Sequence, residues 1–187
     1  MSFWRLKPMR NRWNTGFEKV TEAAVMQIEY YFAYGSNMNP ARVEQRGLLV
    51  GTPQPARLDG FELAFNKADL RHAGEGHANV MACRGSVVEG VLYKLQHPTE
   101  ILKMDPFERA PWNYSRDCIC VNAPLDGANW TVVWTWTYFA NSAVLEDGLA
   151  PSKQYLDHLL AGKPWLSPSY YERLVNWPVA TPEGAPM

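Results

Sequence analysis

The chain has 187 residues, of which 47% are hydrophobic and 20% are charged, a balance typical of a globular protein rather than of a disordered one. This length is enough for one domain with a sizeable core. The net charge is -1, from 18 basic and 19 acidic side chains, and gives no general argument for an acidic partner. We therefore expect no nucleic-acid partner and no membrane partner.

The first 26 residues differ in composition from the rest of the chain. Their charged side chains are all basic before Glu18, and the basic residues are Arg5, Lys7, Arg10, Arg12 and Lys19. No apolar run is long enough for a signal peptide or a membrane span, so we expect a cytoplasmic protein. Met26 stands directly before the first convincing strand. We predict a basic N-terminal extension over residues 1–26, one folded domain over 27–178 and a disordered tail over 179–187.

The most informative stretch combines a strand, a sharp turn and the start of a helix. Residues 28–34 are mostly aromatic and apolar, which is typical of a buried strand. Gly35 permits backbone angles that a residue with a Cβ atom resists. Asn39 is a good N-cap, and Pro40 suits the first helical position because its missing N–H would have no partner there. The pattern predicts a short helix over residues 41–46.

This turn is a candidate anion site. Free backbone N–H groups, the Ser36 and Asn37 side chains and the helix N-terminus would meet at one end of the strand, an arrangement that suits a carboxylate or a phosphate. The alternative is a structural turn that only caps its own helix, since such corners are common. Both interpretations stay open at this point.

The rest of the chain alternates between short strands and short helices. Periodicity and turn residues predict strands over residues 61–65, 78–82, 87–95, 114–121 and 130–139, with a polar loop over 67–77 and a hairpin-like turn over 84–86. They predict helices over 97–105, where Pro106 ends the helix, and over 152–160 and 167–175, each with a serine at its start. The sum is an α+β single domain with a few short helices and a small mixed β-sheet that is bent or barrel-like.

The strand predicted over residues 130–139 has one aromatic face. Its members alternate along the strand and are Trp130, Val132, Trp134, Trp136 and Tyr138. We expect this face to point inward, which would place Tyr138 in the core or in a cavity that the core lines.

The three cysteines do not make a disulfide framework. Cys118 and Cys120 alternate by two within a predicted strand and should share a face, whereas Cys83 stands apart. His72 and His77 are not at a recognised zinc spacing relative to them, so we expect no metal site. We predict reduced, mostly buried thiols. In an alternative interpretation Cys118 or Cys120 is an acyl-transfer nucleophile, which would need a neighbouring base.

Glu108 is the best candidate for a catalytic acid or base. It lies between two prolines, so it should occupy a tight, constrained loop. Phe107 and Trp112 flank it with apolar bulk, which would favour its neutral form and make it a better base. The alternative is a solvated loop glutamate that pairs with Arg109.

Residues 32–38 read Phe-Ala-Tyr-Gly-Ser-Asn-Met, and residues 104–108 read Met-Asp-Pro-Phe-Glu. The first segment resembles the signature that opens γ-glutamylcyclotransferase-like (AIG2-like) proteins, and the second resembles the family's segment that ends in the catalytic glutamate. Arg109 stands where many members have glycine. Shorter matches follow in the family's order at residues 90–93, 114–116, 137–138 and 151–155.

The resemblance implies a small barrel-like α+β fold with a pocket at the Tyr-Gly-Ser-Asn turn. The α-amine of a small-molecule γ-glutamyl compound would attack its own γ-carbonyl and release 5-oxoproline with an amine or amino acid. Glu108 would be the general acid/base. The implied substrate-binding residues are Tyr34, Gly35, Ser36, Asn37, Tyr114, Tyr138 and Tyr155.

No metal or cofactor is implied, and the protein would be a monomer or a homodimer. Glutathione, γ-glutamyl amino acids, γ-glutamyl amines and γ-glutamyl-tagged natural-product intermediates are all open as substrates. The alternative is a non-catalytic module of the same fold that binds a small anion or a γ-glutamyl compound.

Overall fold

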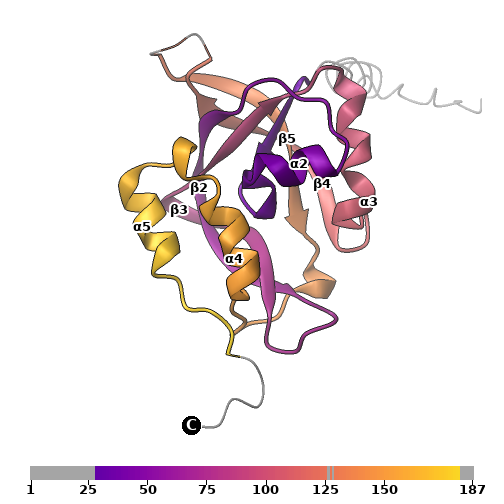
Figure 1. Cartoon of the computed structure of the whole chain (residues 1–187), viewed down its shortest axis with the longest axis vertical. Helices are drawn as coiled ribbons and strands as arrows, with labels where there is room; N and C mark the ends of the chain where they lie inside the picture. The colour runs from indigo at the N-terminus through magenta and orange to yellow at the C-terminus, as the bar shows by residue number, and fades with distance from the viewer. Residues whose placement is uncertain (1–27, 126, 128, 182–187) are drawn as a thin grey trace, which may run out of the picture.

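Five strands close into a barrel in the computed structural model, which describes residues 28–125, 127 and 129–181 (Figure 1). The strands are β1 (Tyr30–Ala33), β2 (Gln54–Ala68), β3 (Gly76–Lys94), β4 (Tyr114–Ala123) and β5 (Thr131–Ala140), in the spatial order β1-β3-β2-β4-β5. β1 pairs with β5 in parallel, and the remaining pairs are antiparallel. The predicted α+β fold with a small, mixed, barrel-like sheet is confirmed.

Short helices lie outside the barrel, with α2 and α4 on the face turned to the viewer and α5 beside α4 (Figure 1). The α-helices are α2 (Pro40–Gln45), α3 (Asp105–Glu108), α4 (Lys153–Leu160) and α5 (Pro168–Val175). The 3-10 turns are η1 (Ser36–Met38), η2 (Pro98–Lys103), η3 (Ser142–Val144) and η4 (Lys163–Trp165). The side chains of Asn39, Ser152 and Ser167 each accept a hydrogen bond from a first-turn backbone N–H, so the three predicted helix starts are confirmed.

β1 is a buried strand of the barrel, paired with β3 and β5. Tyr31, Phe32 and Ala33 are at most 3% exposed, and β3 contributes the fully buried Val91 and Tyr93 beside them. The aromatic composition of β1 thus supplies the centre of the core. Its last residue leads directly into the turn that carries the candidate site.

β3 is one long strand, so the hairpin predicted over residues 84–86 is wrong. Between Ala82 and Val87, β3 has four residues where the paired stretch of β2 has only Gly60. The extra residues form an irregular bulge. The turn-type residues of this stretch therefore belong to a bulge, where the chain does not reverse. Gly60 and Gly85 both have positive φ, at 78° and 86°, and this is the conformation that glycine adopts readily.

β2 also extends beyond its prediction and includes part of the expected polar loop. Leu63, Phe65 and Lys67 alternate with more exposed residues, and all three are buried. Lys67 pairs with His77 across the two strands. The connecting loop therefore covers only residues 69–75, and Lys67 occupies a position that the alternation would assign to an apolar side chain.

The aromatic face of β5 is only partly inward, in contrast to the prediction. Trp130, Val132 and Trp134 are 43%, 66% and 61% exposed, whereas Trp136 and Tyr138 are buried. The buried half is covered by η2 and α3: the Tyr138 hydroxyl donates to Asp105 at 2.7 Å. The prediction failed because alternation identifies a face of a strand but does not show how much of that face another element covers.

The predicted N-terminal extension lies outside the described residues, as does most of the predicted tail. Of the tail, residues 179–181 are described, and the Ala180 N–H donates to the Pro151 carbonyl at 2.9 Å. In the described part of the chain, no helix is long and apolar enough to cross a membrane.

Gly90 provides a test of how closely β3 packs against β1. A Cβ atom on Gly90 would lie 2.8 Å from the Phe32 ring and would also overlap the Ala33 carbonyl. We expect Gly90→Ala to lower the free energy of unfolding by about 1–3 kcal/mol because the overpacked atoms lie in the core. Gly51→Ala is the matched control, since the atoms nearest to its Cβ would lie 3.7 Å away, at an ordinary contact distance. Denaturant unfolding measures both, and equal midpoints would contradict this packing.

Candidate active site

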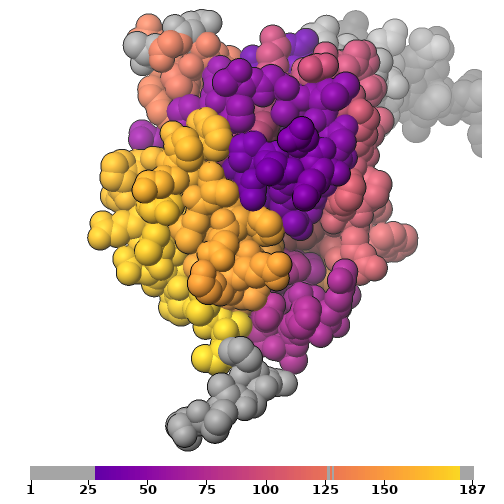
Figure 2. Space-filling view, in the orientation of Figure 1, coloured from indigo at the N-terminus to yellow at the C-terminus, as the bar shows by residue number. Residues whose placement is uncertain are grey.

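A pocket of about 230 Å³ opens where α2, α3, α4 and the β2–β3 hairpin meet. These segments surround a hollow on the face drawn in Figure 2, where they are purple, pink, orange and magenta. Of the residues predicted for the site, Ser36, Glu108, Tyr114 and Tyr155 line this pocket. A smaller cavity of about 30 Å³ continues inward and shares Glu108, Tyr114 and Tyr155 with it.

The smaller cavity is lined by the remaining predicted residues, which are Tyr34, Gly35, Asn37 and Tyr138. All eight predicted site residues therefore line these two cavities, although they come from five separate segments of the chain. Their roles in binding and catalysis stay predictions.

Glu108 is the last residue of α3 rather than part of an irregular loop, so the predicted loop is wrong. Pro106 lies in the first turn of α3, where it needs no N–H partner, and it does not end the preceding helix. Arg109 follows with a φ of 51° and ends the helix. This short helix carries the Glu108 side chain, which is 15% exposed, to the pocket.

Two donors hold one oxygen of the Glu108 carboxylate. Oε1 accepts from Nη1 of Arg46 at 2.8 Å and from Nδ2 of Asn37 at 3.0 Å. Oε2 has no hydrogen-bond partner among residues 28–125, 127 and 129–181. The carboxylate is thus fixed by a charge-assisted pair at one oxygen, and its second oxygen is free to accept a proton.

The environment of Glu108 differs from the expected one. Phe107 and Trp112 are 50% and 79% exposed and do not shield the carboxylate with apolar bulk. The alternative partner Arg109 does not pair with it either, since Arg46 does. The Arg46 guanidinium also lies 5.0 Å from the centre of the Phe107 ring, so Phe107 packs on the cation rather than on the carboxylate.

Asn37 is fixed by the barrel core. Its Nδ2 also donates to the Tyr31 hydroxyl at 2.7 Å, and its carbonyl accepts from the Tyr93 hydroxyl at 2.8 Å. The side chain is buried, yet Oδ1 has no partner within the described part of the chain. A buried acceptor left free in this way suits a donor on a ligand.

Close approach, rather than a special backbone angle, explains Gly35. Its φ is -116°, which other residues also adopt, but a Cβ there would lie 3.1 Å from Ala78 Cβ and 3.2 Å from the Tyr155 hydroxyl. The predicted helix N-terminus is capped within the protein, because the Asn39 side chain accepts the Ala41 N–H at 3.1 Å.

The four tyrosines are fixed by backbone and carboxylate partners. Tyr34 donates to the Tyr138 carbonyl, and Tyr114 donates to the Ala78 carbonyl at 2.9 Å. Tyr155 accepts the Ala78 N–H at 3.1 Å. Burial raises the pKa of Tyr155 to about 12, and hydrogen bonds from Ala78 and Ser36 partly offset this rise. Burial also raises the pKa of Tyr34, Tyr114 and Tyr138, so all four phenols are neutral near pH 7.

The sequence did not identify the basic side chains that line the pocket. They are Arg42, Arg46, Lys67, Arg71 and Arg109, and the carboxylates of the lining are Asp69 and Glu108. Arg46 could not be assigned from local sequence because its partner Glu108 lies 62 residues away. The sequence did contain a sign that Lys67 is buried, since Lys67 continues the inward alternation of Leu63 and Phe65.

His77 stacks on Tyr155 at the wall of the pocket, with ring centres 4.6 Å apart. Burial lowers the pKa of His77 to about 4, and the positive charge of Lys67 contributes to this shift. His77 is therefore neutral at pH 7, and its ring offers an uncharged surface beside the Tyr155 phenol.

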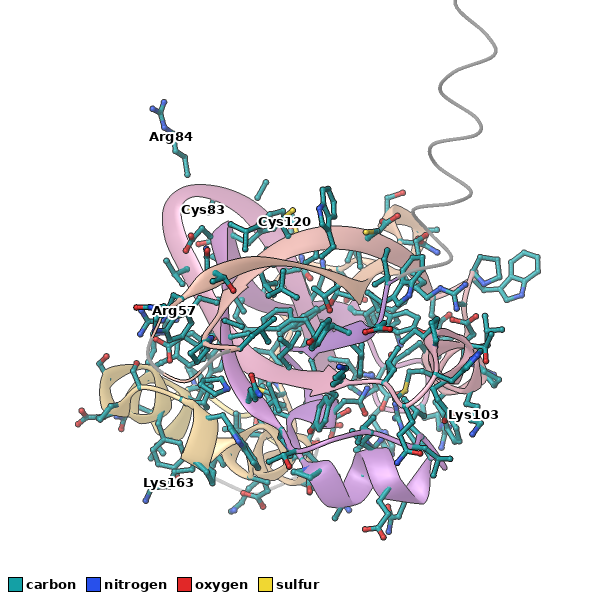
Figure 3. The ribbon with its side chains drawn as sticks, turned by 90° about the horizontal axis from the view of Figure 1, so that it is seen from above. Arg57, Cys83, Arg84, Lys103, Cys120 and Lys163 are labelled. Atoms are coloured by element: carbon teal, nitrogen blue, oxygen red, sulfur yellow. The ribbon has the colours of Figure 1, made fainter. Side chains whose placement is uncertain are left out.

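The cysteines lie away from this site. Figure 3 shows Cys83 and Cys120 on the side of the molecule opposite α2. Cys83 and Cys118 are half-buried and Cys120 is exposed, so the predicted burial is wrong for Cys120, while all three are free thiols. Burial raises the pKa of Cys118. None of the three lines the pocket, which leaves the thiol-nucleophile alternative without a base or a binding site.

One group of side chains in the β2–β3 loop has a ligand-like spacing. Atoms of Asp69, His72 and Glu75 lie within 4.8 Å of one another. Asp69 already accepts from the Arg71 N–H at 2.9 Å and contacts Nδ1 of His72 at 3.0 Å. These contacts account for the arrangement of the loop without a metal.

His77 predicts how stability depends on pH. Its folded pKa of about 4 lies below its ordinary value of 6.5, so the unfolded chain takes up a proton first as the pH falls. The stability that depends on a neutral His77 is fully present above pH 6.5, and this part of the free energy of unfolding is lost as the pH falls toward 4. His77→Gln should therefore lessen the drop in Tm between pH 7 and pH 5. His97→Gln, at an exposed histidine, should keep the parent's drop, and the same drop in all three proteins would contradict the assignment.

Comparisons with known proteins identify the family and the fold of the chain. The family model for gamma-glutamyl cyclotransferase, AIG2-like proteins matches residues 31–166. None of the curated protein sequences matches the chain. Among solved structures, one titled gamma-glutamyl cyclotransferase is 23% identical, covers 83% of this chain and 91% of its own and has a TM-score of 0.68.

Two further solved structures share the fold. An uncharacterised protein from Homo sapiens is 24% identical, with a TM-score of 0.64 and coverage of 83% and 91%. A glutathione-specific gamma-glutamyl cyclotransferase from yeast is 13% identical, with a TM-score of 0.57 and coverage of 78% and 93%. The family match extends over most of the chain and includes both the Tyr-Gly-Ser-Asn turn and Glu108. This chain belongs to the gamma-glutamyl cyclotransferase, AIG2-like family.

Proposed function

We propose that the protein is a γ-glutamylcyclotransferase that converts a γ-glutamyl compound into 5-oxoproline and a free amine or amino acid. The observation that carries the proposal is the Glu108 carboxylate: Oε1 is fixed by Arg46 and Asn37, while Oε2 is free in the pocket beside the turn of residues 34–37. A positioned carboxylate in a sheltered pocket is what proton transfer requires.

The first step of the reaction needs a base that removes a proton from the substrate α-ammonium. The substrate α-amine is an ammonium at neutral pH, and it becomes a nucleophile when Glu108 takes one of its protons. The amine nitrogen then forms a bond to the γ-carbonyl carbon and loses a second proton as it becomes the ring amide. The bond from that carbon to the leaving nitrogen breaks as Glu108 returns the first proton to the leaving nitrogen, and the second proton converts the released amine into its ammonium form. The base is thereby regenerated, and no metal or cofactor takes part in this sequence.

The nucleophile is tethered to the carbonyl that it attacks, so the protein mainly has to fold the substrate into a ring-closing conformation. The buried acceptor Oδ1 of Asn37 and the carboxylate of Glu108 together suit an ammonium. The phenols of Tyr114 and Tyr155 and the turn at Ser36 supply polar groups around the same volume. These groups support a binding site for the glutamyl moiety.

Glu108→Gln tests the catalytic assignment. The amide keeps the size of the side chain and its contacts but cannot accept the proton, so turnover should fall by roughly 10²- to 10⁴-fold. A panel of glutathione, γ-glutamyl amino acids and γ-glutamyl amines is incubated with each protein, and 5-oxoproline is measured by mass spectrometry. The exposed Glu62→Gln is the matched control and should retain the parent's rate.

Two results would contradict the proposal. Turnover of Glu108→Gln within a few-fold of the parent would exclude Glu108 as the acid/base. Binding of γ-glutamyl compounds by the parent without any 5-oxoproline would instead support the non-catalytic binding module of the same fold.

A further inference from the structure

Lys67 is a buried cation without an ion-pair partner in the described part of the chain. It is only 4% exposed, and among the residues described here its ammonium makes no ion pair and no hydrogen bond. Burying an unpaired charge costs free energy, so such residues are rare unless a ligand pairs with them. Lys67 lines the pocket, and its ammonium can therefore be reached by an anion bound there.

Two more cations stand close to Lys67. Burial lowers the pKa of Lys67, and the positive charges of Arg109 and Arg71 add to this effect, whereas the carboxylates of Asp69 and Glu108 oppose it. All of these residues line the same pocket. Repulsion between like charges persists in the empty site, and a bound anion would relieve it.

The two carboxylates of the lining offset only part of the positive charge of this cluster. Glu108 is paired with Arg46, and Asp69 is engaged by the Arg71 N–H and by His72. His77 adds no charge at pH 7 because burial keeps its pKa at about 4. With five cations and two carboxylates around it, the pocket favours a ligand with net negative charge.

The backbone conformation of Arg109 also supports a binding site for an anion. Arg109 has a φ of 51° and is the one residue other than glycine with positive φ in the part of the chain that the structure describes. Glycine would adopt this conformation without cost, whereas an arginine is strained there. The strained position nevertheless carries a side chain that lines the pocket.

We propose that Lys67, Arg71 and Arg109 form an anion subsite that binds a carboxylate on the leaving amine of the substrate. The inference rests on the proposed function and deepens it. A γ-glutamyl group carries one ammonium and one α-carboxylate and has no net charge, so the excess of cations matches a further carboxylate beyond the scissile amide. The protein is thereby selective for γ-glutamyl amino acids or peptides over neutral γ-glutamyl amines.

The test compares two substrates that differ only in this carboxylate, γ-glutamyl-alanine and γ-glutamyl-alaninamide. For the parent, kcat/KM should be roughly 10- to 100-fold higher for γ-glutamyl-alanine, as expected for one charge-assisted contact. Lys67→Met keeps the straight stem and removes the charge. This variant should lose most of the preference through a higher KM for γ-glutamyl-alanine, with little change for the amide.

Two controls make the result specific. Lys94→Met removes an exposed lysine from the same sheet and should keep the parent's preference. Lys67→Met should have a Tm at least as high as the parent's, because it removes an unpaired buried charge. A parent that does not distinguish the two substrates would overturn the proposal. So would an equal loss on both substrates in Lys67→Met, since Lys67 would then bind the glutamyl group itself.

Binding separates this inference from the proposed function. Titration calorimetry of the Glu108→Gln variant with both compounds measures the preference without turnover. Tighter binding of γ-glutamyl-alanine supports the subsite even if no protein in the series makes 5-oxoproline, and in that case only the proposed function fails. Equal affinity for the two compounds overturns the subsite whether or not the parent is active.

Discussion

The hydrogen bonds at Oε1 of Glu108 join three elements that are far apart in the sequence. Arg46 follows α2, Asn37 lies in η1, and Glu108 ends α3, so the partners are separated by 62 and 71 residues. This contact fixes the carboxylate between the turn and the pocket, with one oxygen engaged and the other free. A proton acceptor must be both oriented and unoccupied, and this arrangement satisfies both requirements at once.

The barrel makes the contact between Asn37 and Glu108 possible because its strands fix the turn of residues 34–37. β1 is enclosed by β3 and β5, and the hydroxyls of Tyr31 and Tyr93 hold the amide and the carbonyl of Asn37. Tyr138 of β5 fixes α3 from the other side through Asp105, which pairs with Arg116 at 2.8 Å. Buried polar networks of this kind are costly unless each member is paired, and they therefore specify one geometry.

Local patterns predicted much of this structure. The strand, turn and capped helix around Gly35 and the serine-capped helices depend on residues near one another in the sequence, where propensity and capping act. The errors concern contacts that only the folded chain creates. Neither Arg46 as the partner of Glu108 nor the exposed half of the β5 aromatic face could be inferred without knowing what packs where. Lys67 was assigned to a polar loop together with Gly74 and Gly76, although its place in the alternation indicated burial.

The central claim is that the substrate's own amine, rather than water, attacks the γ-carbonyl beside Glu108. Reaction in water enriched in ¹⁸O tests it most directly, with both products analysed by mass spectrometry. Intramolecular attack predicts 5-oxoproline without ¹⁸O and no free glutamate, because no oxygen from solvent enters the product. Glutamate that carries ¹⁸O in its γ-carboxylate would show that water is the nucleophile and would contradict the account.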